Sequence, residues 1–423
     1  MSKILFTVVP AAGHMNPTIP IAQALQARGH QVRYLTGLSK VALLERAGLS
    51  ATALLPGRFD TVEMISHPVG AHEDSYNPLR IFTWIHYFLK LIELGVVEME
   101  RILADWRPDL VVTDFSTPVG LALARRNHLP FVTTCTVPSC IRTQNGTPVF
   151  LGGLSQPRTP LHHLRDWGGR QLHELLRGSL TFLLRPYWRR LQIKLNLPDG
   201  GDGLYSPDAI LGLAPKELEY SRSDWPAQLH WVGPIEWSEA GALSPESLAF
   251  LQSGQPTVFV TFGSEWFERK EALLRLICQT LTSNGICTVV TGGGAVDLSA
   301  LQLPNLHVLP YAPYPEILPR VTAVIHHGGA GITYSTLRAG KPALVIPDGK
   351  DQPDNAQKVV EAGVGLRLNQ PQVTPARVQN ATSQLLTEIA YHNRAAHIAE
   401  QLERYTPVPT SVDVIEALLE RKY

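Results

Sequence analysis

A glycine-rich stretch in the second half of the chain has the composition of an anion-binding turn. The residues HHGGAG, 326–331, follow an apolar run that ends at Ile325, and a helical pattern comes next. Gly328, Gly329 and Gly331 would let a ligand approach bare backbone amides. The start of the following helix adds the partial positive charge of aligned peptide dipoles, which suits a phosphate or diphosphate. A tight strand-to-helix connection is the alternative interpretation.

A second polar stretch follows about one helix and one strand later. DQPDNA, residues 351–356, comes directly after the apolar run PALVIP and its short polar turn. Ligands of open α/β sheets bind at the carboxyl ends of the strands. Asp351 and Gln352 there could accept from and donate to adjacent sugar hydroxyls, whereas Asp354 fits a solvated turn and helix cap. The chain has neither a P-loop motif nor a GxGxxG motif with a downstream acid, so other nucleotide folds are disfavoured.

A histidine and an aspartate in the first half could form a proton-transfer pair. His14 follows the apolar run ILFTVV in the stretch AAGHMNP, and Asp114 ends the run PDLVVTDF. Both would lie at the carboxyl edge of one parallel sheet. Histidine can act as a base near neutral pH, and a carboxylate on its other nitrogen fixes the tautomer. A loop or capping residue is the alternative interpretation of His14.

The elements that must position these residues alternate between strand and helix in two series, which predicts two parallel α/β domains. We expect a first domain over residues 1–232, a linker over 233–253 and a second domain over 254–404. A C-terminal helix over 405–423 would pack back on the first domain. The linker is expected from the Gly, Pro and Ser content of WVGPIEWSEAGALSPES.

The bulk composition narrows the classes of partner. Lys+Arg and Asp+Glu both number 37, so no net charge favours a nucleic-acid or acidic-membrane partner. No long uncharged apolar run or signal-peptide core appears, so a soluble cytoplasmic protein without a strong membrane signal is expected. The cysteines, which form no C-x-x-C pair, are expected to be free thiols: Cys135, Cys140, Cys278 and Cys287.

The chain resembles family 1 glycosyltransferases of the GT-B fold, which include plant, sterol, macrolide and bacterial natural-product UDP-glycosyltransferases. The resemblance covers nearly the whole chain. It is strongest in HHGGAGIT…GKPALVIPDGKDQPDNA, with support from GHMNP, WVGP, VFVTFGS and VLPYAPYPEILP. It implies two Rossmann-like domains that face each other across a cleft, with acceptor binding in the first domain and nucleotide-sugar binding in the second.

The resemblance also implies donor-site roles. The ring of His327 would hold the donor diphosphate together with amides around the turn, which are those of Gly329, Ala330, Gly331, Ile332 and Thr333. Ser264 would contact the same diphosphate across the crevice, and Asp351 and Gln352 would hold the donor sugar. Tyr311 and Ala312 lie where the family usually has a tryptophan stacked on uracil and its neighbour.

Three residues depart from the family pattern: Ile332 removes one hydroxyl from the phosphate contacts, and Tyr311 and Tyr314 leave the nucleobase open. Ile332 stands where threonine or serine is common, and Tyr311 replaces the larger stacking ring. Tyr314 stands where glutamine is frequent. The helix N-terminus and His327 can carry the leaving-group charge, so no metal and no cofactor beyond the nucleotide sugar, UDP-sugar first, are expected.

The function predicted from these residues is an inverting hexose transfer from UDP-glucose, or from a dTDP-sugar, to a hydroxyl of a lipophilic small molecule. His14 would be the general base, assisted by Asp114. Aromatic residues of the first half could line the acceptor pocket, although core packing is their alternative role: Phe82, Trp84, Phe88 and Phe150. A catalytically silent sugar-nucleotide-binding protein, a lipid-linked saccharide transferase and a nucleotide-sugar epimerase remain as alternatives. The sequence leaves open whether oxygen or carbon is glycosylated, and it leaves the oligomeric state open.

Overall fold

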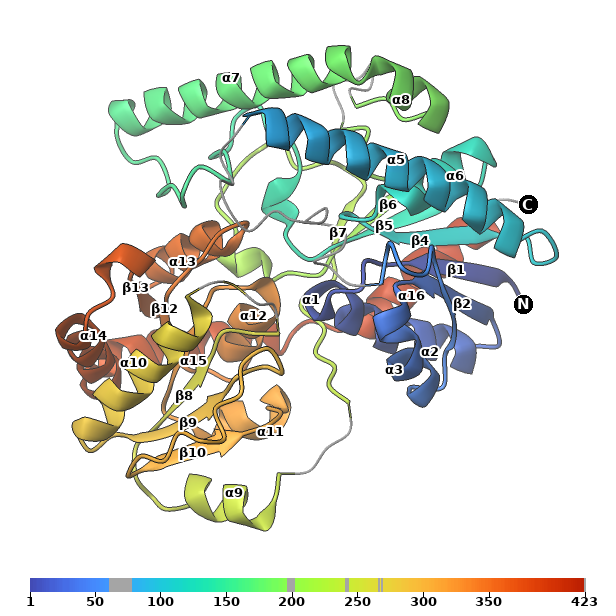
Figure 1. The fold of residues 1–423 in the computed structure, drawn as a ribbon. Helices are drawn as coiled ribbons and strands as arrows, with labels where there is room; N and C mark the ends of the chain where they lie inside the picture. Colours follow the sequence, from blue (N-terminus) through green and yellow to red (C-terminus); the bar gives the residue numbers. More distant parts are fainter. Residues whose placement is uncertain (61–77, 196–201, 240–242, 265–266, 268, 422–423) are drawn as a thin grey trace.

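The computed structural model describes residues 1–60, 78–195, 202–239, 243–264, 267 and 269–421, with the side chains of 78–86 outside the description. Figure 1 shows two lobes, one built mainly from the first half of the chain and one from the second. Among the described residues, no helix is both long enough and apolar enough to cross a membrane. The Phe82 and Trp84 side chains predicted at the acceptor site lie outside the described residues.

The first lobe contains a parallel sheet in the order β3-β2-β1-β4-β5-β6-β7. Its strands are rich in β-branched and aromatic residues, as expected for a sheet buried on both faces. Their bounds are β1 Lys3–Thr7, β2 Gln31–Thr36, β3 Ser50–Ala53, β4 Leu110–Asp114, β5 Phe131–Cys135, β6 Ala209–Gly212 and β7 Leu229–Trp231.

Helices cover both faces of this sheet, because alternate strand residues point to opposite sides. On one face, Leu5 and Val111 pack against α5 (Pro78–Ile102), α6 (Pro118–Arg126) and α8 (Arg185–Leu191). On the other face, Ile4 and Phe6 pack against α2 (Ile19–Ala27) and α16 (Pro407–Glu420). The remaining helices of this lobe are α1 Ala12–Met15, α3 Leu38–Arg46 and α7 Pro160–Leu183.

The second lobe repeats this plan with the parallel order β10-β9-β8-β11-β12-β13. The strands are β8 Thr257–Thr261, β9 Cys287–Thr291, β10 Leu306–Leu309, β11 Ala323–His326, β12 Ala343–Val345 and β13 Gly365–Arg367. One face packs on α10 (Lys270–Ser283) and α14 (Pro375–Thr387). The other packs on α11 (Tyr314–Ile317), α12 (Ala330–Arg338), α13 (Gln352–Glu361) and α15 (Ile389–Leu402).

The order of strands reverses direction at one point in each sheet. In the first sheet this switch point lies between β1 and β4, and in the second it lies between β8 and β11. The connections after these strands run to opposite sides, which opens a crevice at their carboxyl ends where ligands bind. The described chain therefore has two such crevices, one in each lobe.

The chain passes between the lobes at two places that touch each other. The first follows β7, and the second precedes α16, which packs on α2 of the first lobe (Figure 1). Gly233 lies in the first passage, with φ +89°, and Tyr405 lies in the second. A Cβ atom at Gly233 would lie 2.5 Å from the Tyr405 ring, so a side chain there would collide with it.

Two local details differ from the sequence expectations. The predicted linker contains a helix, α9 (Pro245–Leu251), and Leu243 and Leu251 pack in the core of the second lobe. His14 lies in the one-turn helix α1 rather than in a loop, because the chain turns helical directly after Ala11. The domain boundaries themselves remain predictions. Single 3-10 turns complete the fold: η1 Asn16–Thr18, η2 Pro138–Cys140, η3 Lys216–Leu218, η4 Leu318–Arg320 and η5 Gln370–Gln372.

Candidate active site

The predicted pair of His14 and Asp114 is formed at the switch point of the first sheet. His14 follows β1, Asp114 ends β4, and His14 Nδ1 lies 2.9 Å from Asp114 Oδ1. The Asp114 side chain is 1% exposed and the His14 side chain 26%. Because an ionised carboxylate only accepts hydrogen bonds, this contact places the proton of a neutral imidazole on Nδ1. Nε2 is then the nitrogen with a lone pair.

Ser116 is a third member of this cluster that the sequence did not single out. Its backbone amide donates to Asp114 Oδ1 at 3.0 Å, and its hydroxyl donates to the same oxygen. The hydroxyl also lies 3.3 Å from His14 Nδ1. The ring of Phe115 packs beside the imidazole with 5.4 Å between centroids. The signal in the sequence was the spacing of aspartate and serine, whose side chain and amide close a turn two residues apart.

An apolar pocket adjoins this cluster. Its lining residues come from the loops after β1, β3 and β4 and from α5 and α6: Val9, Phe59, Phe88, Leu91, Ile92, Ser116, Thr117, Pro118 and Val119. Of the predicted acceptor residues, Phe88 therefore lies at this pocket. Phe150 does not line it. Its ring is exposed, and its left-handed backbone, with φ +58°, is fixed by a hydrogen bond from its amide to Asp354 Oδ2 at 2.8 Å.

The crevice of the second sheet is formed mainly by glycine backbone. Gly263 follows β8 with φ +70°, and Gly328 follows β11 with φ +90°. A Cβ atom at Gly263 would lie 2.8 Å from the His327 ring, and one at Gly329 would lie 2.4 Å from His327 Nε2. The imidazole of His327 is thus enclosed by two glycines on neighbouring loops. Any side chain at either position would displace it.

The first turn of α12 presents its amides beside this ring. Helix geometry provides no partner for the first N–H groups, which here belong to Ala330, Gly331 and Ile332. The Ile332 side chain is buried in the core, so only its amide can face a ligand. Thr333 differs from the expectation, because its amide and its hydroxyl both donate to the carbonyl oxygen of Gly329, at 3.1 and 2.9 Å. Thr333 therefore stabilises the helix start and has no donor left over.

His326 has a supporting role in the same turn. Its ring is fully buried, and Nδ1 accepts a hydrogen bond from the amide of Gly328 at 3.0 Å. Burial lowers the pKa of His326 to about 3, so the ring stays neutral and remains an acceptor.

Asp351 is held against the glycine turn by a residue outside the predicted site. The side-chain amide of Asn355 donates to Asp351 Oδ2 at 2.8 Å and to the carbonyl of Gly328 at 2.9 Å. Burial raises the pKa of Asp351, while its hydrogen bonds, including that from Asn355, oppose that rise. Gln352 accepts from the amide of Asp348 at 2.8 Å through its Oε1.

The remaining predicted donor residues lie at the carboxyl ends of β8 and β10, which β9 separates in the sheet. Ser264 is exposed directly after Gly263, at the end of β8. Tyr311 and Ala312 follow β10, the Tyr311 side chain being half exposed and Ala312 buried. Tyr314 packs edge-on against Phe259 with 6.1 Å between centroids, so its ring belongs to the core.

Asp354 corrects a sequence expectation. It was assigned to a solvated turn, yet it is buried between the lobes and accepts the amide hydrogen bond of Phe150. Burial raises its pKa to about 6. One turn further along α13, Lys358 forms a buried ion pair with Glu219 of the first lobe, with 2.8 Å between Nζ and Oε2. The helix that begins at the donor turn therefore also carries much of the contact between the lobes.

Among the described residues, no group of three or more His, Cys, Asp or Glu side chains is placed to hold a metal ion. The groups available for a diphosphate in this crevice are the α12 amides and the His327 ring. Together with the Asp351 carboxylate and the imidazole of His14, they can bind a phosphorylated sugar and accept a proton.

Known proteins resemble the chain over nearly its whole length. Residues 286–420 match the family described as erythromycin biosynthesis protein CIII-like, C-terminal domain. The 4'-demethylrebeccamycin synthase of Lentzea aerocolonigenes is 26% identical, with 99% of this chain and all of that protein covered. Zeaxanthin glucosyltransferase of Pantoea ananas is 22% identical, covering 99% of this chain and 96% of the relative.

Solved structures share the fold. The calicheamicin glycosyltransferase CalG4 has a TM-score of 0.73 and 21% identity, with 100% of this chain and 99% of that chain covered. SsfS6 of Streptomyces sp. SF2575, a glycosyltransferase solved with thymidine diphosphate, has a TM-score of 0.68 and 20% identity, with 99% and 100% covered.

Proposed function

Because the chain is a GT-B glycosyltransferase of the bacterial natural-product, family 1 type, we propose that it transfers a hexose with inversion to a hydroxyl of a lipophilic small molecule. His14 acts as the general base and Asp114 as its partner. The observation that carries this proposal is the 2.9 Å contact between the two side chains at the switch point of the first sheet.

The proton moves from the acceptor hydroxyl to Nε2 of His14. Because Nδ1 of the neutral ring donates to Asp114, Nε2 is the ring nitrogen that carries the lone pair. As the bond to the anomeric carbon forms, the imidazole becomes positively charged, and the adjacent carboxylate stabilises that charge. A base in this position contributes roughly 10²–10⁴-fold to the rate.

The leaving nucleoside diphosphate gains negative charge in the same step. The amides of Ala330, Gly331 and Ile332, the α12 dipole and His327 are the groups that would stabilise it. Asp351 and Gln352 would hold the sugar hydroxyls on the way to the anomeric carbon. Inversion follows if the hydroxyl attacks from the His14 side while the diphosphate leaves toward α12.

We take the acceptor to be a lipophilic alcohol or phenol because the pocket next to His14 is mainly apolar. Its lining is apolar apart from Ser116 and Thr117, and Phe88 from α5 forms part of it. Sites for such molecules are typically apolar with few polar groups that fix orientation. The relatives' names, a demethylrebeccamycin synthase and a zeaxanthin glucosyltransferase, agree with acceptors of this kind.

The donor is proposed to be UDP-glucose, with a dTDP-sugar as the second candidate. A relative named as a glucosyltransferase favours glucose, whereas the solved neighbour with thymidine diphosphate favours the other base. Tyr311 stands where the base would stack, and tyrosine accommodates either pyrimidine.

The test is to incubate the full chain with UDP-glucose, dTDP-glucose and a panel of phenols and terpenoid alcohols, and to read product masses. A mass increase of one hexose, with the product's anomeric configuration opposite to the donor's by NMR, is expected. Tight nucleotide binding without any transfer would favour the silent binding protein instead. A retained anomeric configuration would overturn the single-displacement mechanism.

A further inference from the structure

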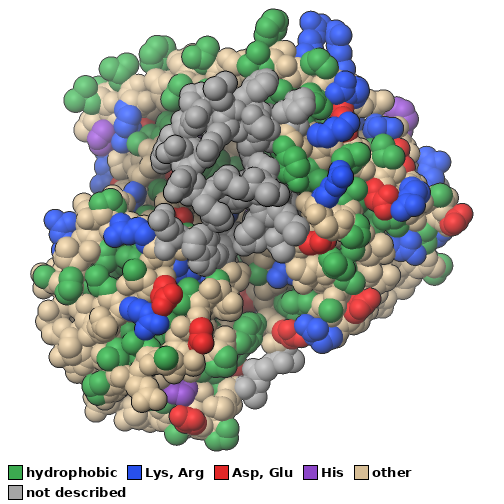
Figure 2. All heavy atoms as spheres, viewed as in Figure 1, with side chains coloured by type: hydrophobic (Ala, Val, Ile, Leu, Met, Phe, Trp, Pro, Cys, Tyr) green, Lys and Arg blue, Asp and Glu red, His purple; other side chains and the backbone are tan. Residues whose placement is uncertain are grey.

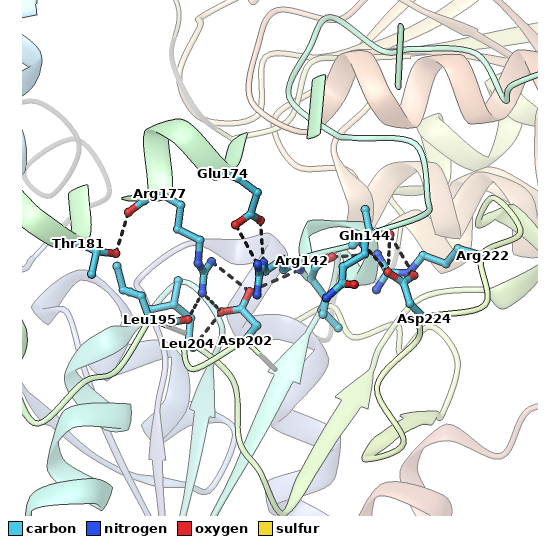
Figure 3. A network of polar contacts seen from close by, with 12 residues as sticks. Arg142, Gln144, Glu174, Arg177, Thr181, Leu195, Asp202, Leu204, Arg222 and Asp224 are labelled. Carbon is cyan, nitrogen blue, oxygen red and sulfur yellow. Dashed lines mark hydrogen bonds and ion pairs between the residues drawn. The ribbon is translucent and has the colours of Figure 1, made fainter. Parts of the chain in front are cut away.

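Helix α7 of the first lobe is folded with its charged side facing the protein. Figure 3 shows its inner side chains in a network with the loops beneath. Arg142 Nε lies 2.7 Å from Glu174 Oε1 of α7, and Arg177 of α7 lies 2.7 Å from Asp202. Asp166 is buried and pairs with Arg165. These charged side chains of α7, which on a surface helix usually face water, are therefore engaged in ion pairs with one another and with the loops beneath.

The outer side of α7 is apolar. Eight of the fourteen large hydrophobic side chains that are exposed in the described residues belong to this one helix, with exposed fractions from 45 to 76%. They are Leu161, Leu164, Trp167, Leu172, Leu175, Leu176, Phe182 and Leu183. Figure 2 shows hydrophobic side chains along the upper edge of the molecule, where Figure 1 places α7. The charged residues of α7 are buried or half-buried, and Glu174, whose side chain is 38% exposed, is held in an ion pair with Arg142.

Exposed arginines continue the α7 face at its carboxyl end. Helix α8 follows after one residue and exposes Arg185, Arg189 and Arg190. Arg190 pairs with Glu93, whereas Arg185 and Arg189 form no ion pair within the residues that the structure describes. An apolar helix face of Leu, Trp and Phe bordered by arginines is the composition of helices that lie in a membrane interface.

We propose that the outer face of α7, with the α8 arginines, docks the enzyme on an anionic lipid surface. The leucines and aromatic rings would enter the boundary between headgroups and acyl chains, and Arg185 and Arg189 would contact lipid phosphates. The sequence predicted no membrane signal because the arginines of α7 could not be assigned to its inner side before the fold was known. This docking does not depend on the proposed reaction.

The charges disfavour a second copy of the chain as the occupant. Parallel pairing of two α7 helices would bring the α8 arginines of the two copies together. Antiparallel pairing would bring them near Arg158 of the other copy, which already pairs with Glu361. The acidic residues of α7 give these arginines no free partner, since Asp166 is buried beside Arg165 and Glu174 is paired with Arg142. Lipid phosphates supply the missing negative charge.

The test measures binding of the full chain to vesicles of equal parts phosphatidylglycerol and phosphatidylcholine by co-sedimentation, without substrates. Leu164→Ser combined with Leu175→Ser should weaken binding by roughly 100-fold or more, because each leucine loses its apolar burial. Arg185→Gln combined with Arg189→Gln should weaken it by roughly 30-fold, and pure phosphatidylcholine vesicles should bind the wild type less well.

The matched control is Ile389→Ser, which removes an equally exposed aliphatic side chain on α15 of the other lobe. It should leave vesicle binding unchanged. Circular dichroism confirms that each variant is folded. Equal sedimentation of wild type and both double variants would overturn the proposal. So would a vesicle-free dimer, seen by light scattering, that the leucine substitutions dissociate, since the occupant would then be a second copy.

Discussion

Both lobes have their candidate site at the switch point of a parallel sheet, but the first site is formed by side chains and the second mainly by backbone. At the switch point of the first sheet, side chains converge, with His14 and Asp114 reaching across from neighbouring strands. At the switch point of the second, Gly263, Gly328 and Gly329 leave bare backbone around the imidazole of His327. Proton transfer requires a titratable group with a partner, whereas a diphosphate is best bound by amides that nothing covers.

This difference predicts opposite sensitivities in the two lobes. The first site should fail when atoms are removed, and the second should fail when atoms are added. The following substitutions separate these two modes, beginning with the largest expected effect.

His14→Ala should lower kcat by about 10²–10⁴-fold, since the acceptor hydroxyl loses its base. Steady-state kinetics with a fixed acceptor measure this. Calorimetric affinity for the nucleoside diphosphate should remain as in the wild type, because no donor group is altered. A parallel loss of nucleotide affinity would show that the two lobes do not divide the work in this way.

Gly329→Ala should lower kcat/KM for the donor by about 100-fold, because the new methyl would collide with His327 Nε2 and shift the diphosphate contacts. The KM for the acceptor should not change. Gly349→Ala is the control, since a Cβ atom there meets nothing within 4 Å. Normal donor kinetics in Gly329→Ala would mean that the glycine turn does not contact the donor.

Asp114→Asn should lower kcat by about 10- to 10⁴-fold, because the new amide can donate to Nδ1 of His14 and so reverse the tautomer of the ring. This loss of rate should not exceed the loss in His14→Ala. Ser116→Ala should cost only a few-fold, since it removes one hydrogen bond to Asp114. The order of the three rates, from Ser116→Ala down to His14→Ala, is the check on a positioning role for Asp114. Equal rates in wild type and Asp114→Asn would contradict it.

The smallest effect concerns the contact between the lobes. Burial raises the pKa of Asp354 from 3.8 to about 6, so the folded protein holds this proton more tightly than the unfolded chain. The stabilisation is complete below about pH 4 and is lost as pH rises through about 6, by at most about 3 kcal/mol. Asp354→Asn removes this loss and keeps an acceptor for the Phe150 amide.

Urea unfolding of wild type and Asp354→Asn at several pH values measures the difference. The variant should gain stability relative to wild type as pH rises from about 4 to about 7. A difference that does not vary with pH would show that Asp354 titrates alike in both states.

The fold and the paired residues were largely predictable because their signals are local. Apolar runs such as ILFTVV and VFVTFGS indicate buried parallel strands, and carboxyl ends of such strands meet at one edge. That reasoning placed His14 and Asp114 at the same edge of one sheet but did not show that their side chains touch, and the role of His327 was implied by the family resemblance. Glycines after a strand also indicated where backbone would be exposed.

Features that depend on long-range packing were not predictable. Asn355 joins Asp351 to Gly328 only because α13 begins beside the turn after β11. Asp354 resembled a helix cap until the loop of Phe150 was found to cover it. Helix α7 has hydrophobic and charged residues at helical spacing, and spacing alone does not say which side faces water.

The contact of Gly233 with the Tyr405 ring has a mechanical consequence. Both connections between the lobes pass this contact, so they are held against each other at one point. A rotation of one lobe about this point would stretch neither connection, but it would have to break the buried ion pair of Lys358 with Glu219. A larger residue at Gly233 would collide with the Tyr405 ring and so disturb the relative position of the lobes without touching either crevice.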